Sequence, residues 1–434
     1  MGAASRFEPD AQRGISRKAR RHRRIVISGW YGMGNLGDEV ILQSMVHQLR
    51  ARLGDVSFTG FSERPDRLRS EHLVNSLRNT TRRLDSARKV FAIARADIFI
   101  LGGGGILMDY GRGDTNVSKW LEDMELAQRL RVHNVAWGVG VGEVWTDESK
   151  QWIAQVLPKA DRISVRDQES AMALAGLGVT GASVTCDPAL MIPGLEEARS
   201  QRALRKTSRG PNILVSLRHW HVTGDWTHDE AVFGKVKSEL ARVLNHLSEA
   251  DGASVTFVPF RTEGKDDDDR KVEAEVKDLL HEGGRSVLID HVPRSDEFLK
   301  FAGDADLVIG MRLHSLILGS AVGVPCIGLA YDPKVKNYMS SIGADAWVLP
   351  MQEVSFETLG QKADAALSGE YPSSLIERRI AELRESARVD IDGAIKLIEE
   401  EDHFRQKVGR LSTASALAIR KILARRRRAR KTPG

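Results

Sequence analysis

Short apolar runs alternate with longer amphipathic stretches along most of the 434-residue chain. Runs of three to six mostly apolar residues, many of them ending in glycine, are typical of buried strands, and apolar residues at helical spacing fill the segments between them. The predicted strands cover residues 24–29, 56–60, 98–101, 134–137, 163–166, 213–217, 254–258, 287–289, 307–309 and 326–329. This alternation, interrupted once and then repeated, predicts an α/β protein with two doubly wound parallel-sheet domains that face one cleft.

The same pattern divides the chain into six parts. The polar, helix-breaking stretch that ends in Ser208-Arg209-Gly210-Pro211 marks a linker between the two domains. The predicted parts are a disordered basic arm (1–24), an N-terminal domain (25–195), a linker (196–211), a C-terminal domain (212–350), C-terminal helices (351–404) and a basic tail (405–434).

Charge is distributed unevenly along the chain. The whole chain carries +5, the first 24 residues carry +6 and the last 30 carry +11, so residues 25–404 carry −12. An acidic body argues against a specific nucleic-acid partner, which would need basic residues on the folded surface.

The cysteine content and the hydropathy indicate which kinds of protein the chain does not resemble. Cys186 and Cys326 are far apart, and neither belongs to a Cys-x-x-Cys motif, so neither a disulfide framework nor a zinc site is expected. No apolar run has transmembrane length. A cytoplasmic protein is therefore expected, with peripheral contact to the inner face of the membrane as an option.

That option depends on the tail. Six basic residues fall within 425–431, and the segment before them has apolar residues at roughly helical spacing. These apolar residues are Leu411, Ala414, Leu417, Ala418, Ile422 and Leu423. An amphipathic helix followed by a polybasic cluster is typical of segments that bind an anionic membrane surface. A tail that only aids solubility, or that touches nucleic acid non-specifically, is the alternative.

The most informative stretch is 310–338. Arg312 and His314 follow the apolar strand 307–309 directly, at the start of a helix, and Tyr331 and Lys334 follow the next strand. Ligands bind at the carboxyl ends of strands in open parallel sheets, and helix N-termini favour anions. These residue types predict an anion-binding site that also transfers protons. In the alternative interpretation, Arg312 is a cap and His314 a core histidine.

Glycine-rich turns follow several predicted strands of the first half. Gly32, Gly34 and Gly37 have the spacing of a dinucleotide-binding fingerprint, but Asp38 and Glu39 would oppose a pyrophosphate, so a tight turn with a helix cap is at least as plausible. Further turns are expected at 102–105, 138–142 and 187–188. The acidic run 266–269 is expected to be solvated, with a metal site as a minor alternative.

In their order along residues 25 to about 340, these segments resemble the polysaccharide pyruvyl transferase family. The matching segments are Gly32-x-Gly34-Asn35-x-Gly37-Asp38-Glu39, Gly102-Gly103-Gly104, Ser164-Val165-Arg166-Asp167, Cys186-Asp187-Pro188-Ala189, Gly310-x-Arg312-Leu313-His314-Ser315, Gly323-Val324-Pro325 and Tyr331-Asp332-Pro333-Lys334. The resemblance implies two Rossmann-like halves, similar to the GT-B glycosyltransferases. It also implies transfer of an enolpyruvyl group from phosphoenolpyruvate to a sugar hydroxyl pair. The product is a pyruvate ketal on a cell-surface glycan or its precursor, and no metal or cofactor is required.

The resemblance also assigns roles to residues. Arg312 and His314 are the expected catalytic residues, with Arg312 holding one anionic group of the donor and His314 transferring a proton. Arg166, Arg218 or Lys334 would hold the other anionic group. The expected substrate-binding residues are Arg166, Arg218, Lys334, Asn35, Asp38, Gly103, Gly104, Asp187, Leu313, Ser315 and Tyr331.

The expected partners are phosphoenolpyruvate and an acceptor that is a sugar, an oligosaccharide or a lipid-linked glycan. Two alternatives stay open, since a fold does not fix a function. One is a nucleotide-sugar glycosyltransferase, and the other is a non-catalytic membrane-associated scaffold.

Overall fold

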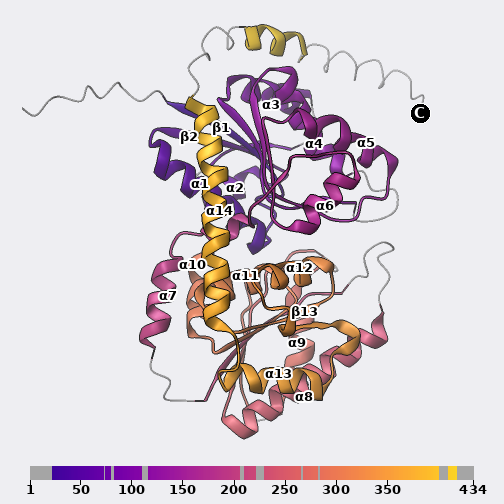
Figure 1. Ribbon diagram of the computed structural model, residues 1–434, viewed down its shortest axis with the longest axis vertical. Helices are drawn as coiled ribbons and strands as arrows, with labels where there is room; N and C mark the ends of the chain where they lie inside the picture. The colour runs from indigo at the N-terminus through magenta and orange to yellow at the C-terminus, as the bar shows by residue number, and fades with distance from the viewer. Residues whose placement is uncertain are drawn as a thin grey trace, which may run out of the picture.

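A computed structural model shows two α/β halves stacked along the long axis of the molecule (Figure 1). It describes residues 22–72, 74–79, 83–109, 116–205, 210–220, 229–264, 267–281, 284–399 and 409–417. The predicted basic arm lies outside these residues up to position 21, and the first strand begins at Arg23.

The N-terminal half is built on a parallel sheet with strand order β3-β2-β1-β4-β6-β7-β8, and β5 pairs with β6. Its strands are β1 (Arg23–Ser28), β2 (Val56–Ser62), β3 (Asn75–Arg78), β4 (Ile98–Leu101), β5 (Gly104–Leu107), β6 (His133–Val141), β7 (Arg162–Val165) and β8 (Ser183–Val184). Its helices are α1 (Leu36–Leu53), α2 (Pro65–His72), α3 (Arg83–Arg95), α4 (Asn116–Arg129), α5 (Asp147–Val156) and α6 (Gln168–Gly176), with short 3₁₀ helices η1 (Leu157–Lys159) and η2 (Pro188–Met191).

The C-terminal half repeats the plan, with strand order β11-β10-β9-β12-β13-β14 and parallel pairing throughout. Its strands are β9 (Asn212–Ser216), β10 (Ser254–Phe257), β11 (Arg285–Leu288), β12 (Leu307–Gly310), β13 (Cys326–Ala330) and β14 (Val348–Pro350). Its helices are α8 (Glu230–Asp251), α9 (Asp269–Lys277), α10 (Ser295–Asp304), α11 (Leu313–Val322), α12 (Pro333–Ser341) and α13 (Phe356–Leu367), with η3 (Asp345–Trp347) and η4 (Met351–Glu353). The predicted fold class, two doubly wound parallel sheets, is confirmed.

The strand order reverses direction once in each sheet, between β1 and β4 and between β9 and β12. Such switch points open a crevice at the carboxyl ends of the strands. All four residues of β12 are buried, as in a parallel strand covered on both faces. Helix α11 ends at Val322 and is capped by Gly323, whose φ of 94° suits a glycine C-cap. The turn between β12 and α11 carries Arg312 to His314.

Several elements differ from the sequence-based prediction. The edge strand β3 was not predicted, because Asn75–Arg78 has no apolar run. The glycine turn expected at 138–142 is mostly strand, since β6 continues through Gly138 with a positive φ of 58° and a shift in register. A side chain at Gly138 would overlap Pro188, and one at Gly140 would overlap the Arg166 guanidinium, so glycine permits both close approaches.

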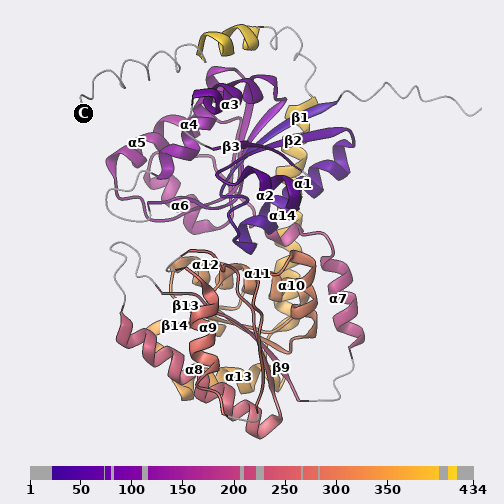
Figure 2. The same cartoon turned by 180° about the vertical axis from the view of Figure 1, so that it is seen from behind.

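Two helices connect the halves. Helix α7 (Leu195–Leu204) occupies much of the predicted linker and packs on α10 and α11. The long helix α14 (Ser373–Glu399) runs across both halves (Figures 1 and 2) and contacts α1 and β6 on one side and α11 on the other. Within α14, the Asp390 carboxylate accepts a hydrogen bond from the Thr185 hydroxyl at 2.7 Å.

The halves also touch directly at the start of α1. The backbone N–H of Leu36 donates to the carbonyl of Phe260 at 2.9 Å, and Asn35 forms an antiparallel bridge with Arg261. Further along the same face, the Ser295 hydroxyl donates to the Gln43 side chain at 2.6 Å. The first turn of α1 is therefore fixed to the C-terminal half.

Part of the predicted amphipathic tail packs on the protein itself. Residues 409–417 are helical, with Ala414 buried and Leu417 partly buried against the N-terminal core, and Arg410 donates to the Arg131 carbonyl at 2.5 Å. Residues 418–434, with the polybasic cluster, lie outside the described residues, so membrane docking stays a prediction. Within the described ranges, no helix is both long enough and apolar enough to cross a bilayer.

Candidate active site

A cavity of about 680 Å³ lies between the two halves, at the switch points of both sheets. Its size falls in the usual range for small-molecule sites. The N-terminal half lines it with Trp30, Asn35, Asp38, Gly105, Ile106, Met108, Asp109, Asn116, Trp120, Val141, Gly142, Glu143, Trp145, Arg166, Asp167, Glu169 and Ala173. The C-terminal half lines it with Arg218, Phe260, Arg261, Asp267, Arg312, Leu313, His314, Tyr331, Asp332, Pro333, Lys334 and Asn337.

His314 lies at the seam between the halves. It occupies the first turn of α11, and its Nε2 is 3.6 Å from an oxygen of Asp187 in the N-terminal half. This Nε2 is buried and has no hydrogen-bond partner among the described residues. The backbone of Gly37 covers the ring so closely that a side chain at position 37 would overlap Nδ1. The imidazole is thus positioned by both halves, yet it keeps an unsatisfied nitrogen.

Asp38 lines the same cavity from the first turn of α1. Burial raises the pKa of its carboxyl to about 7; Glu39 and Asp187 add to the rise, while His314 and Arg261 oppose it. A carboxyl group that titrates near neutral pH can act as a general acid or base.

Arg312 is buried and paired within the protein. Its Nε and Nη2 donate to Asp269 at 2.9 and 2.5 Å, and Nη2 also donates to Asp267 at 3.3 Å. Burial alone would lower the pKa of Arg312, but Asp269 and Asp267 raise it, so the side chain stays charged. The fork predicted to hold a substrate anion is therefore largely occupied by carboxylates of the chain.

Asp269 itself corrects the expectation of a solvated acidic run. Its side chain is fully buried, and one oxygen accepts the backbone N–H groups of Phe260 and Arg261 at 2.9 and 3.0 Å. A carboxylate with a bidentate guanidinium partner and two backbone donors can be buried without an uncompensated charge.

Three guanidinium groups converge on Asp267. Arg261 Nη1 lies 2.7 Å from one of its oxygens, and Arg218 and Arg312 lie 3.5 and 3.3 Å from the other. All four residues line the cavity, so a single carboxylate of the protein occupies the centre of its densest positive charge.

Tyr331 and Lys334 extend this positive region. The Arg218 guanidinium lies over the Tyr331 ring, 5.0 Å from its centroid, and donates to the phenol oxygen at 3.2 Å. Lys334 Nζ lies 5.1 Å from the same centroid and 3.1 Å from Asp332. Burial would raise the pKa of Tyr331, but the Arg218 and Lys334 cations lower it.

Arg166 approaches from the opposite half. Its Nε is 3.3 Å from Asp167 and its Nη1 is 3.5 Å from Asp187. The same Asp187 oxygen faces His314, so Asp187 links Arg166 with His314 across the seam. Burial would raise the pKa of Asp187, but His314 and Arg166 lower it, which favours the carboxylate form.

Four predicted site residues do not line the main cavity: Gly103, Gly104, Asp187 and Ser315. Ser315 is fully buried and its hydroxyl donates to the Arg312 carbonyl at 2.6 Å, which fixes the turn before α11. Gly104 has a φ of 98°, and a side chain there would approach the Asp38 carboxylate. Gly103 allows close approach of Pro188 and the Gly138 carbonyl.

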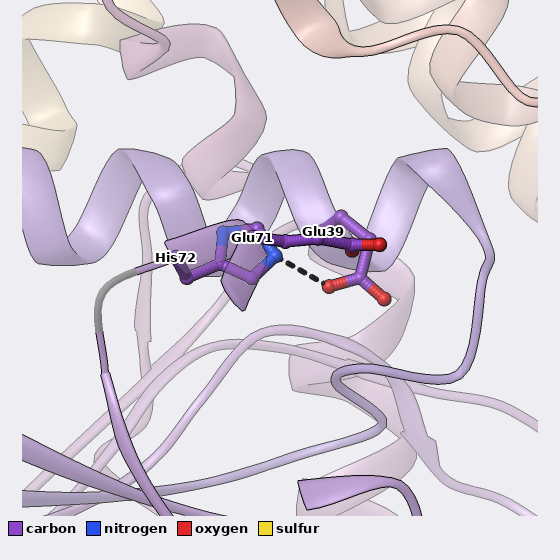
Figure 3. Close-up of side chains that lie close together, drawn as sticks. All are labelled: Glu39, Glu71 and His72. Carbon is purple, nitrogen blue, oxygen red and sulfur yellow. Dashed lines mark hydrogen bonds and ion pairs between the residues drawn. The ribbon is translucent and has the colours of Figure 1, made fainter. Parts of the chain in front are cut away.

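The glycine loop before α1 is occupied by the protein's own carboxylate. Glu39 accepts the N–H groups of Gly32 and Gly34 at 3.2 and 3.3 Å, and His72 Nε2 lies 2.7 Å from the same side chain (Figure 3). Glu71 lies beside Glu39 and His72, and its carboxylate accepts a hydrogen bond from Arg67 Nε at 2.7 Å. Because these loop N–H groups already have an acceptor, they do not form a phosphate cradle of the dinucleotide type.

Sequence reasoning missed two parts of the cavity. Arg261 follows β10, so the rule that ligands meet the carboxyl ends of strands could have found it. Trp30, Trp120 and Trp145 come from separate segments with no shared motif, and only the fold brings them together.

Solved structures of similar fold include sugar-nucleotide enzymes. A putative UDP-N-acetylglucosamine 2-epimerase from Listeria monocytogenes matches with a TM-score of 0.58 and 12% identity, covering 88% of this chain and 98% of that one. UDP-GlcNAc 2-epimerase from Neisseria meningitidis, bound to UDP-GlcNAc, matches with a TM-score of 0.54 and 10% identity, covering 86% and 100%. Identities this low show the fold alone, and they agree with the predicted GT-B-like arrangement.

No curated protein sequence is detectably similar to the chain. A family model for polysaccharide pyruvyl transferase does match it, over residues 35–333. This span is more than half of the chain and includes Asp38, Asp187 and His314. The predicted resemblance is confirmed, and the protein belongs to the polysaccharide pyruvyl transferase family.

Proposed function

We propose that this protein transfers a pyruvyl unit from phosphoenolpyruvate to two hydroxyl groups of a sugar, forming a pyruvate ketal on a cell-surface glycan or its precursor. The observation that carries the proposal is the cavity in which Asp38 and His314 adjoin a group of cations. This combination suits a reaction that binds a multiply charged anion and moves protons in the same space.

The donor has a carboxylate and a phosphate, so it needs at least two cationic contacts. Arg218, Arg261 and Arg312 would bind one of these groups at the position that Asp267 occupies. Arg166 and Lys334, which approach from opposite halves, would bind the other. In this assignment Arg312 adds positive charge beside Asp267 and does not form a bidentate contact with the donor, because its Nε and Nη2 already donate to Asp269.

The reaction requires two proton movements. One sugar hydroxyl adds to C2 of the donor while a proton is delivered to C3, which turns the methylene into a methyl group. The bond from C2 to the phosphate oxygen then breaks, phosphate leaves with the electron pair, and the second hydroxyl adds to C2. One hydroxyl proton balances the proton given to C3, and the other leaves with the phosphate.

Asp38 and His314 are the groups placed for these transfers. A carboxyl with a pKa of about 7 is a good proton donor at neutral pH. The His314 imidazole, which lines the cavity, would accept a hydroxyl proton. The Asp187 carboxylate faces Nε2 of His314 and would stabilise the imidazolium that forms.

The direct test is an assay of the leaving group. Purified protein is incubated with phosphoenolpyruvate and neutral glycosides, or with nucleotide sugars and the same glycosides. Phosphate release that needs both phosphoenolpyruvate and a glycoside is expected, with a loss of about 10²–10⁴ in His314→Ala. Nucleotide release without phosphate release would instead identify a glycosyltransferase and overturn the proposal.

The packing of Gly37 on the imidazole gives a prediction for a residue that has no reactive side chain. Gly37→Ala should displace the His314 ring and lower kcat about 10²-fold, because small misplacements of catalytic groups are costly. The melting temperature should fall as well, since the overlap is with an imidazole buried at the seam, so kcat is measured well below the unfolding transition of the variant. Gly176→Ala, which meets no atom within 4 Å, is the control and should keep full activity. Full activity of Gly37→Ala would contradict the placement of His314.

Asp38 should produce an ionisation near pH 7 in the profile of kcat/KM, and Asp38→Asn should remove it along with most of the activity.

The same substitution, which lowers activity, should increase the stability of the protein above neutral pH. The pKa is raised in the folded state, so the stabilising effect of the proton is present below about pH 4 and is lost by about pH 7. Asp38→Asn should therefore raise the melting temperature at pH 8 and not at pH 4. An unchanged profile would exclude Asp38 as the titrating group.

Asp267 should compete with the donor for its three arginines. Asp267→Asn keeps the shape and removes the charge, so the KM for phosphoenolpyruvate should fall about 3- to 10-fold. Asp268→Asn is the matched control, because Asp268 pairs with Arg270 and does not line the cavity. A higher KM in Asp267→Asn would show that Asp267 positions the arginines instead of competing with the donor.

A further inference from the structure

The cavity is chemically divided. Its positive region is formed by Arg218, Arg261, Arg312 and Lys334 of the C-terminal half together with Arg166 of the N-terminal half, whereas another part of its N-terminal side carries Trp30, Trp120, Trp145 and Met108. We call these last four residues the aromatic wall. Three of the eight tryptophans of the chain therefore line one cavity, although they come from the end of β1, from α4 and from the segment before α5.

The wall is held in place by contacts behind it. Trp30 and Trp120 meet edge to face, with ring centroids 6.1 Å apart and an interplanar angle of 83°, and Trp120 is part of the N-terminal core. The backbone N–H of Trp145 donates at 2.9 Å to the fully buried Asp109. Asp109 also accepts the Ser149 hydroxyl at 2.6 Å, which anchors the start of α5. A surface held in this way need not reorganise to bind a ligand.

Two acidic residues of the N-terminal half also line the cavity. Glu143 lies two residues before Trp145, Glu169 lies on α6, and both carboxylates are exposed. They would repel a phosphate or carboxylate and can accept hydrogen bonds from hydroxyl groups. An aromatic face and nearby carboxylates suit the apolar C–H face and the hydroxyls of an uncharged sugar ring.

The wall adjoins the positive region of the cavity. A side chain at Gly105 would lie 3.6 Å from Met108 Sδ and 4.0 Å from an Arg166 nitrogen. Gly105 therefore lies between Met108 of the wall and Arg166 of the positive region. A ring resting on the wall would thus lie next to a donor bound by Arg166. We propose that the aromatic wall is the acceptor subsite and binds the pyranose ring of an uncharged sugar. This inference depends on the proposed function for the identity of the donor.

The test measures sugar binding and donor binding separately. The probes are methyl pyranosides of glucose, galactose, mannose, N-acetylglucosamine and N-acetylmannosamine, with methyl glucuronide as the charged counterpart. Binding is measured by saturation-transfer NMR and calorimetry, and phosphoenolpyruvate is titrated in parallel. At least one neutral glycoside should bind in the millimolar range, and the glucuronide should bind more weakly.

The variants test the wall itself. Trp145→Ala and Trp30→Ala should each weaken glycoside binding about 10-fold, and Trp145→Phe about 3-fold or less, because it keeps an aromatic face. The affinity for phosphoenolpyruvate should stay within about 2-fold in all three. Trp152→Ala, on α5 and absent from the cavity lining, is the control and should bind both probes normally.

Each outcome decides one question. If phosphoenolpyruvate binds and no neutral glycoside does, or if the Trp145 and Trp30 variants bind glycosides normally, the acceptor subsite is wrong and the donor assignment survives. If glycosides bind through the wall and phosphoenolpyruvate does not bind, the proposed function is wrong and the wall is a sugar site of a different enzyme. Loss of phosphoenolpyruvate binding in Trp145→Ala would also overturn the subsite, since the wall would then belong to the donor.

Discussion

The arrangement of the site depends on one contact, the docking of the first turn of α1 against the C-terminal half. The Leu36 N–H bonds to the Phe260 carbonyl, and Gly37 covers the His314 ring. This contact places Asp38 of one half in the same cavity as His314 of the other. Without it, two Rossmann-like domains would each present half of a constellation that has no chemistry alone.

The contact also accounts for the unusual state of Asp38. The docking buries its carboxyl at the seam, and burial is the main reason that its pKa rises to about 7. Two glycines leave room for this packing. Gly37 lies against the His314 imidazole and Gly104 lies beside the Asp38 carboxylate, and a side chain at either position would crowd these groups. The glycines of these loops therefore serve packing at the seam, and two N–H groups of the loop before α1 are taken by Glu39.

The cations of the cavity are all compensated by the protein's own acids. Arg312 pairs with Asp269, Arg166 with Asp187 and Asp167, and Lys334 with Asp332. Burying these charges unpaired would be strongly unfavourable, so the acids are needed for folding. Asp267 differs from the others because it faces three guanidinium groups. Like Asp167 and Asp332, it also lines the cavity. An anionic ligand can take its place without leaving a buried charge unpaired.

Much of this could be predicted from the sequence, and the part that could not has a physical reason. Short apolar runs located most strands, and the position of Arg312 and His314 after a buried strand pointed to the cleft. Contacts between residues far apart in the sequence could not be predicted, because the order of residues does not show that the Asp269 carboxylate pairs with the Arg312 guanidinium. Strand β3 was not predicted, because this edge strand is mostly polar and has no run of apolar residues.

The central claim is that an acid in this cavity delivers a proton from solvent to C3 of phosphoenolpyruvate. It is tested most directly by running the reaction in D₂O with a neutral glycoside and analysing the product by mass spectrometry after return to H₂O. The account predicts a ketal that carries one non-exchangeable deuterium in its methyl group, formed together with one phosphate. A product that retains the methylene group, or a ketal without deuterium, would contradict it.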